Sequence, residues 1–198
     1  MFFNWFKRYQ LFTKEECDKI ILDVEKNKDK LKVSSEHGTI DISSYEVNTY
    51  ELSTDIHEMI QNKLNGIASD KIIQCFVIRY SPDTIPDMPA HYDGTKYSLV
   101  VNLNNDFEDG GTYFPLRRYY HDPKNNNIGE GILYKGNKIL SWHQAIPVTK
   151  GVRYVLNVKY LNDKGKLWTL FTILKYIIYQ YTIVKIFSKK YTKKLDKQ

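Results

Sequence analysis

Few of the features that mark secreted or disulfide-rich proteins are present in this chain. It has only two cysteines, Cys17 and Cys75, in no zinc-binding spacing, and it has no N-x-S/T sequon. Two cysteines cannot form a disulfide framework, so a reduced, cytoplasmic location is the simpler expectation, with a single disulfide as the open alternative. The aromatic start of the chain is interrupted by polar residues and lacks the apolar core and small-residue cleavage site of a secretory signal.

An excess of charge of one sign is also missing from most of the chain. The net charge is +6, with 29 Lys+Arg against 23 Asp+Glu. Residues 1–163 carry 20 basic and 22 acidic residues, whereas residues 164–198 carry nine lysines and one aspartate. Binding to nucleic acids is supplied largely by neutralisation of phosphates. The slightly acidic main body therefore disfavours a nucleic-acid partner.

The C-terminal segment, residues 164–198, differs in composition from the rest of the chain. Residues 167–187 are mostly apolar, and about 20 such residues are needed to cross a bilayer. Lys175 and Lys185 interrupt this stretch, and a charge near the bilayer centre costs about 2.5 to 3.5 kcal/mol, so spanning is marginal. The apolar side chains gather on one face of a helix. We expect a membrane or oligomer contact through residues 167–198, either as an interfacial helix or by packing on the main body or a second copy.

Two helices are predicted in the first third of the chain. The four residues from Thr13 have the spacing of a capping box, and apolar residues follow at helical period, which predicts a helix to about Leu31. Ser53 as N-cap and Asn65-Gly66 as stop predict a second helix. The polar residues 32–50 between them are interpreted as a loop.

The remainder of the main body has short apolar stretches separated by Gly, Asn, Asp and Pro. Strands are predicted at residues 1–12, 72–80, 97–103, 111–114, 131–134, 139–143 and 152–160. This pattern is typical of a sandwich or jelly roll. We expect a mostly β fold with flanking helices around a double-stranded β-helix, with residues 116–127 as a solvated loop or, alternatively, a substrate-facing lip.

Two histidines and one aspartate form a candidate metal site. If the chain is extended at His91, the side chains of His91 and Asp93 share one face. The imidazole of His143 completes two nitrogens and one carboxylate, the facial triad that binds Fe(II) in non-haem oxygenases and leaves coordination positions open. An H-x-D triplet alone is weak evidence. The other histidines lie in polar surroundings and are not expected to bind metal: His37, His57 and His121.

Arg153 is a second candidate site residue. It follows His143 by ten residues and lies in an alternating apolar strand. A planar guanidinium can hold a carboxylate through two parallel hydrogen bonds. Arg153 is therefore chemically suited to hold a carboxylate.

Three stretches of the chain together resemble a known family. HYDGTKYSLVVNLN, EDGGTYF and HQAIPVTKGVRYVLNVKY are similar to the catalytic core of Fe(II)/2-oxoglutarate dioxygenases of the prolyl and lysyl hydroxylase group, over roughly residues 72–163. The resemblance implies that iron is held by His91, Asp93 and His143, and that Arg153 binds the distal carboxylate of 2-oxoglutarate. It also matches five flanking residues: Gly110, Gly111, Phe114, Gly129 and Gly131.

The same resemblance implies an activity and a domain plan. The expected enzyme uses Fe(II), 2-oxoglutarate and O2, with ascorbate as an optional reductant, and hydroxylates a prolyl or lysyl residue of a protein with release of succinate and CO2. The dioxygenase domain would cover residues 1–163, with helical support in 1–70 and the catalytic jelly roll in 71–163, followed by the extension 164–198.

Two other functions use the same residues. A zinc hydrolase can bind its metal through two histidines and one carboxylate, with an open position for water. It has no need of Arg153, and no glutamate base stands beside His91. A non-catalytic jelly-roll binding module is the third interpretation, which the intact set of four site residues disfavours.

Overall fold

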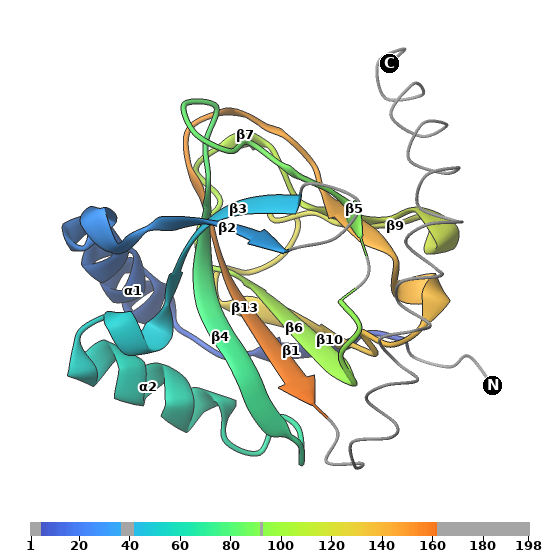
Figure 1. Cartoon of the computed structure of the whole chain (residues 1–198), viewed down its shortest axis with the longest axis horizontal. Helices are drawn as coiled ribbons and strands as arrows, with labels where there is room; N and C mark the ends of the chain where they lie inside the picture. Colours follow the sequence, from blue (N-terminus) through green and yellow to red (C-terminus); the bar gives the residue numbers. More distant parts are fainter. Residues whose placement is uncertain (1–4, 37–41, 92, 162–198) are drawn as a thin grey trace.

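The computed structural model describes residues 5–36, 42–91 and 93–161 (Figure 1). The interpretations that concern His37, Tyr92 and the extension 164–198 fall outside these residues. No helix within the described ranges is both long and apolar enough to cross a membrane.

Two antiparallel sheets and a short strand pair make up the fold. The larger sheet has seven strands in the order β1 (Lys7–Gln10), β10 (Glu130–Tyr134), β6 (Tyr97–Asn102), β13 (Arg153–Leu161), β4 (Lys71–Tyr80), β3 (Ile42–Asn48) and β2 (Lys32–Glu36). The smaller sheet has four strands in the order β5 (Met88–His91), β11 (His143–Ala145), β8 (Thr112–Phe114) and β9 (Tyr119–His121). The pair consists of β12 (Val148–Lys150) and β7 (Glu108–Asp109). This is the predicted mostly β, jelly-roll architecture.

The alternation of side chains along β13 and β4 divides the core into two layers. Leu156 and Val77 belong to the cluster that includes residues of both helices, whereas Val155 and Ile78 belong to a second cluster with residues of the smaller sheet. Successive side chains of a strand point to opposite faces, so the larger sheet has a helical side and a site side. In Figure 1 both helices lie together on one side of this sheet.

The two helices begin where the sequence predicts. α1 (Lys14–Lys26) has the predicted capping box, in which the Thr13 hydroxyl accepts from the Glu16 amide and the Glu16 carboxylate accepts from the Thr13 amide. α2 (Thr54–Leu64) follows Ser53. α1 ends before the predicted Leu31, because Asn27 caps it and a 3-10 turn, η1 (Lys28–Lys30), follows.

Three predictions of secondary structure are wrong. Residues 32–50 contain β2, β3 and a 3-10 turn, η2 (Thr49–Glu51), instead of a loop. Their backbones pair with each other and with β4, and such pairing does not require an apolar pattern. Part of the predicted loop 116–127 is β9, which pairs with β8, after the 3-10 turn η3 (Pro115–Arg117). The predicted strand 139–143 is mainly the 3-10 turn η4 (Ile139–Ser141), which is closed by backbone hydrogen bonds from Ser141 to Lys138 and from Trp142 to Ile139. The Ser141 hydroxyl adds a bond to the Lys135 carbonyl at 2.6 Å.

Both cysteines are free and buried, so the open alternative of a disulfide is excluded. Burial raises the pKa of the Cys17 thiol to about 12 and that of Cys75 to about 11. Neither is a reactive thiolate at neutral pH.

Candidate functional site

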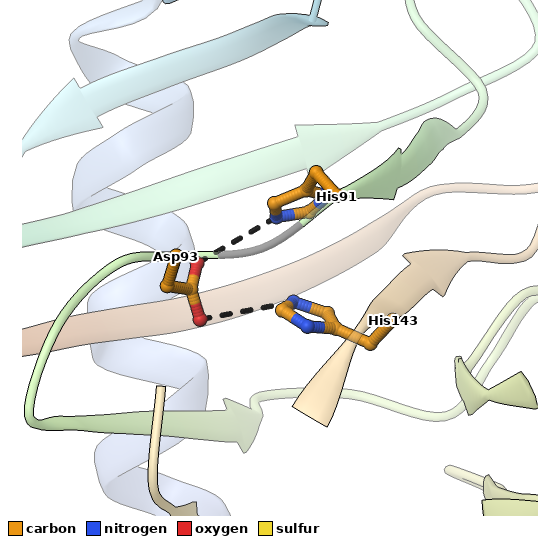
Figure 2. A group of neighbouring side chains, drawn as sticks. All are labelled: His91, Asp93 and His143. Atoms are coloured by element: carbon orange, nitrogen blue, oxygen red, sulfur yellow. Dashed lines mark ion pairs between the residues drawn. The ribbon is translucent and has the colours of Figure 1, made fainter. Parts of the chain in front are cut away.

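The candidate metal ligands meet on the smaller sheet, facing the larger one. His91 ends β5 and His143 begins β11, and the two lie directly opposite each other in the antiparallel pair. Asp93 follows β5 and is not part of the strand. Figure 2 shows the three side chains pointing toward one another. His91 Nε2 lies 3.6 Å from Asp93 Oδ1, and His143 Nε2 lies 3.9 Å from Asp93 Oδ2.

Backbone carbonyls orient both imidazoles for metal binding. His91 Nδ1 lies 2.9 Å from the Pro89 carbonyl, and His143 Nδ1 lies 2.8 Å from the Ser141 carbonyl. A carbonyl only accepts, so each Nδ1 carries the proton and donates, which leaves the Nε2 lone pair directed at the shared space. This second hydrogen bond is the usual support of a metal-ligating histidine.

Asp93 presents one free oxygen to the same space. Its side chain is 1% exposed. The Tyr134 hydroxyl donates to Oδ2 at 2.9 Å, while Oδ1 has no hydrogen-bond partner among the described residues. Burial raises the pKa of Asp93, but its interactions with His143 and His91 and the positive charge of Lys159 together outweigh burial and hold the pKa well below its ordinary value. The group is therefore a carboxylate at neutral pH.

The three residues fit a divalent metal. Their ligand atoms all lie within 4.8 Å of one another. Burial and the neighbouring His91 lower the pKa of His143 to about 4, so its imidazole is neutral and its lone pair available. An unpaired buried carboxylate oxygen is costly unless a ligand satisfies it, and a metal ion would do so.

Arg153 lies on β13, opposite Tyr80 of β4, and is 1% exposed. Its Nη1 donates to the Gly111 carbonyl at 3.1 Å, and its Nη2 donates to Asn102 Oδ1 and Thr112 Oγ1, each at 3.2 Å. Its Nε has no partner among the described residues. A buried cation with an unused N–H suits a carboxylate ligand.

A small cavity joins Arg153 to the metal ligands. Its volume is about 20 Å³, which is room for roughly one water molecule. Its polar lining includes His91, His143, Arg153, Thr112 and Asn157. A ligand larger than water therefore requires side chains of this lining to move.

The surroundings of two residues that flank the site explain why one is a phenylalanine and the other a glycine. Phe114 is fully buried and stacks on the His143 ring, with centroids 5.3 Å apart. Gly110 has φ +75°, and a Cβ there would lie 2.9 Å from the Phe107 ring and 3.3 Å from Arg153 Cδ. A side chain at position 110 would therefore displace the guanidinium.

The structure brings all four predicted site residues to one place and adds residues that sequence reasoning missed. Asn157 lies two positions beyond Val155 on the site face of β13. The two-residue period of a strand could therefore have predicted that Asn157 faces the site. Nothing in the sequence marks Tyr134 as the partner of Asp93. His121 was interpreted as part of a solvated loop, but it is completely buried, and it lies outside the metal-ligating group.

The chain is similar in sequence to proteins that are named as procollagen lysyl hydroxylases. No family model matches it. It is 27% identical over 168 residues to the multifunctional procollagen lysine hydroxylase and glycosyltransferase of Rattus norvegicus, covering 75% of this chain and 22% of the relative. It is 25% identical over 134 residues to the procollagen lysyl hydroxylase and glycosyltransferase of Acanthamoeba polyphaga mimivirus, covering 64% of this chain and 14% of that protein. The chain thus spans less than a quarter of the length of these relatives.

Solved structures share its fold at lower identity. The viral collagen prolyl hydroxylase of Paramecium Bursaria Chlorella virus-1, in its 2-oxoglutarate complex, superposes with a TM-score of 0.53 and 19% identity over 79% of this chain and 95% of that one. The Trichoplax adhaerens prolyl hydroxylase, solved in complex with a hypoxia inducible factor peptide, superposes with a TM-score of 0.57 and 15% identity, covering 83% of this chain and 87% of that one. The chain therefore has the fold of these prolyl hydroxylases and sequence similarity to the procollagen lysyl hydroxylases, the group that its motifs resemble.

Proposed function

We propose that this chain is an Fe(II)- and 2-oxoglutarate-dependent dioxygenase that hydroxylates a prolyl or lysyl residue of a protein or peptide. One observation carries the proposal: the same small cavity is lined by two of the candidate metal ligands, His91 and His143, and by a buried arginine with an unused N–H. A 2-oxoacid with a second carboxylate matches this pair, since one end can meet a metal and the other a guanidinium.

Each site residue has a separate task in this proposal. His91, Asp93 and His143 would hold the iron, and Arg153 would orient the far carboxylate of 2-oxoglutarate. Tyr134 lies within hydrogen-bonding distance of both Asp93 Oδ2 and His143 Nε2. If a metal bound at Nε2, the hydroxyl proton would be left to Asp93 Oδ2, and Oδ1, which has no hydrogen-bond partner among the described residues, would be the oxygen available to the metal. Iron, 2-oxoglutarate and O2 would supply the oxidising chemistry, and the protein would supply their alignment in a buried site.

A zinc hydrolase on the same three ligands is the alternative. The burial of Arg153 weighs against it, because hydrolysis at an open metal position has no use for a fully desolvated guanidinium beside the ligands. Burial deprives the Arg153 guanidinium of its interactions with water, and an anionic ligand would replace them. The same cost weighs against a non-catalytic module.

A protein or peptide substrate is supported by the relatives and not by any side chain seen here. The lysyl hydroxylase relatives are named for procollagen, and one structural neighbour was solved with a peptide. None of the described site residues distinguishes proline from lysine. A cytoplasmic location remains a proposal from the composition alone.

Succinate formation tests the proposed function. The purified protein is incubated with Fe(II), 2-oxoglutarate and two peptide sets, one proline-rich and one lysine-rich, and both succinate and the peptide mass are measured. We expect succinate to depend on Fe(II), and a gain of one oxygen atom in one of the two sets.

Variants of the metal ligands provide the controls for this assay. Asp93→Ala and His143→Ala should abolish turnover, whereas His57→Ala, on α2 at the helical side of the sheet, should retain it. Peptide cleavage with zinc in the absence of 2-oxoglutarate would instead establish the hydrolase. Retained succinate formation by His143→Ala would refute the assigned ligand set.

A further inference from the structure

Three buried residues form a hydrogen-bonded chain that ends on Arg153. His121 is 0% exposed, and Asn102 and Arg153 are each 1% exposed. His121 Nε2 lies 3.0 Å from Asn102 Nδ2, and Asn102 Oδ1 accepts from Arg153 Nη2 at 3.2 Å. The three come from β9, β6 and β13, so the chain crosses from the smaller sheet to the larger one.

The arginine determines the direction of every hydrogen bond in this chain. A guanidinium only donates, so the amide of Asn102 must turn its oxygen toward Arg153. Its NH2 group then faces His121, where it can only donate. His121 must therefore accept at Nε2 and carry its proton on Nδ1.

His121 remains an acceptor because it does not become charged. Burial lowers the pKa of His121 to about 3, and the positive charges of Arg153 and Arg8 act in the same direction. A protonated imidazole would donate from both nitrogens and would meet the NH2 group of Asn102 with a second N–H. The neutral ring is thus a requirement of the Asn102 orientation that Arg153 needs.

The other ring nitrogen of His121 also faces the NH2 group of an asparagine. His121 Nδ1 lies 3.1 Å from Asn126 Nδ2, and Asn126 Oδ1 accepts from Arg8 at 2.5 Å. Two N–H groups therefore meet on this side. The NH2 group of Asn126 also donates to the Asp122 carbonyl, so it has an acceptor of its own, and Asn126 is half-buried whereas Asn102 is enclosed. The contact with Asn102 decides how the ring is held.

From this arrangement we infer that His121 is a positioning residue for cosubstrate binding: it holds the Asn102 amide, which in turn holds the Arg153 guanidinium in the orientation that receives a carboxylate. The inference rests on the proposed function, since it assigns Arg153 to 2-oxoglutarate. His121 belongs neither to the metal-ligating group nor to the cavity lining, so its effect is confined to cosubstrate affinity.

Direct binding measurements test this role. The protein is loaded with Mn(II), which prevents turnover, and 2-oxoglutarate is titrated calorimetrically; KM and kcat are measured with Fe(II) in parallel. His121→Leu should weaken 2-oxoglutarate binding about three- to tenfold, the range that one lost hydrogen bond corresponds to. KM should rise by the same factor, and kcat at saturation and Mn(II) affinity should stay near wild type.

Two further variants separate positioning from general damage to the fold. His121→Gln restores an acceptor for Asn102 and should recover most of the affinity, whereas His57→Leu, on α2, should change nothing. His121→Met lacks a strong acceptor and replaces His121→Leu if that variant does not fold. Equal weakening by His121→Gln and His121→Leu would overturn the inference.

A double-mutant cycle tests whether His121 acts through Asn102. If it does, His121→Leu should cause no further loss of 2-oxoglutarate affinity in an Asn102→Ala background, because coupled residues are not additive. Additive losses of 2-oxoglutarate affinity would show that His121 does not act through Asn102. If the wild-type protein with Mn(II) binds no 2-oxoglutarate at all, the proposed function is refuted. If it binds 2-oxoglutarate with the same affinity in wild type and in His121→Leu, only the role of His121 is refuted.

Discussion

At the scale of single residues, Arg153 combines full burial with an N–H that no described residue accepts. We predict that Arg153→Leu raises the KM for 2-oxoglutarate by at least about 30-fold, since losing one partner of a buried charge pair costs about 2 kcal/mol or more. Arg153→Lys keeps the charge without the planar fork, so its KM should fall between those of wild type and Arg153→Leu. Iron binding, measured by titration without cosubstrate, should change little in either variant. Unchanged 2-oxoglutarate affinity in Arg153→Leu would make the arginine purely structural.

The buried imidazole of His121 makes stability depend on pH. Its pKa is lowered from 6.5 to about 3, so between these values the unfolded chain binds a proton that the folded chain does not. The stabilisation is complete above about pH 6.5 and is lost as the pH falls toward 3, at up to about 1.4 kcal/mol per pH unit.

Denaturation of the metal-free protein in urea measures this dependence. We expect the free energy of unfolding to fall more steeply between pH 6.5 and pH 4 in wild type than in His121→Gln, because glutamine does not titrate. Parallel curves for the two proteins would show that folding does not lower the pKa of His121.

At the scale of elements, Gly129 fixes the turn that joins β9 to β10 and docks the start of the chain. Its carbonyl accepts from the amides of Leu11 and Phe12 at 3.0 and 3.3 Å. Its φ is +78°, and a Cβ would lie 2.0 Å from the Phe12 carbonyl oxygen. Gly66 has φ +82° with nothing within 4 Å of a Cβ, which makes it a matched control.

We predict different costs for alanine at these two glycines. Gly66→Ala should destabilise by about 1 to 2 kcal/mol, the cost of left-handed backbone for an L-residue. Gly129→Ala adds a backbone clash and should cost about 3 kcal/mol or more. Urea midpoints at unchanged m-value give both numbers. Equal losses would mean that the backbone at Phe12 moves aside without cost.

Elements with a local chemical signal could be predicted, and those without one could not. The capping box at Thr13 involves only four consecutive residues, so the start of α1 can be predicted from the sequence. β2 and β3 exist because their backbones pair with each other and with β4. In residues 32–50 apolar residues alternate with polar ones only at Ile40 and Ile42 and at Tyr45 and Val47, which is too short a pattern to predict two strands. η4 replaces a predicted strand and is held by backbone hydrogen bonds within the turn and by the bond from the Ser141 hydroxyl to the Lys135 carbonyl, contacts that hydrophobic periodicity does not report.

At the scale of the whole molecule, the division at about residue 163 is still a prediction. The last described strand, β13, ends at Leu161, and Tyr160 is its last buried residue. We predict that a chain truncated after Asn162 folds and forms succinate, and that the full chain sediments with acidic liposomes in a partly salt-sensitive way. The nine lysines of residues 164–198 favour anionic headgroups by about 1 kcal/mol for each lysine near the surface.

Liposome sedimentation and thermal melting of both chains decide between a lipid contact and a protein contact. Liposomes of neutral lipid serve as the control for the electrostatic part. If residues 167–187 pack instead on the main body or on a second copy, the truncated chain should melt at lower temperature and aggregate. An unstable truncated chain together with no lipid binding by the full chain would refute the anchoring.

The sequence by itself predicted the start of both helices and the jelly-roll class, and it singled out His91, Asp93, His143 and Arg153 as candidate site residues, because these predictions depend on residue type and on spacing along the chain. Only the tertiary structure decided that Tyr134 holds Asp93 and that His121 lies buried behind Asn102 and Arg153. These contacts join strands that are distant in the sequence, and their strength comes from burial, which is created only when the two sheets close on each other.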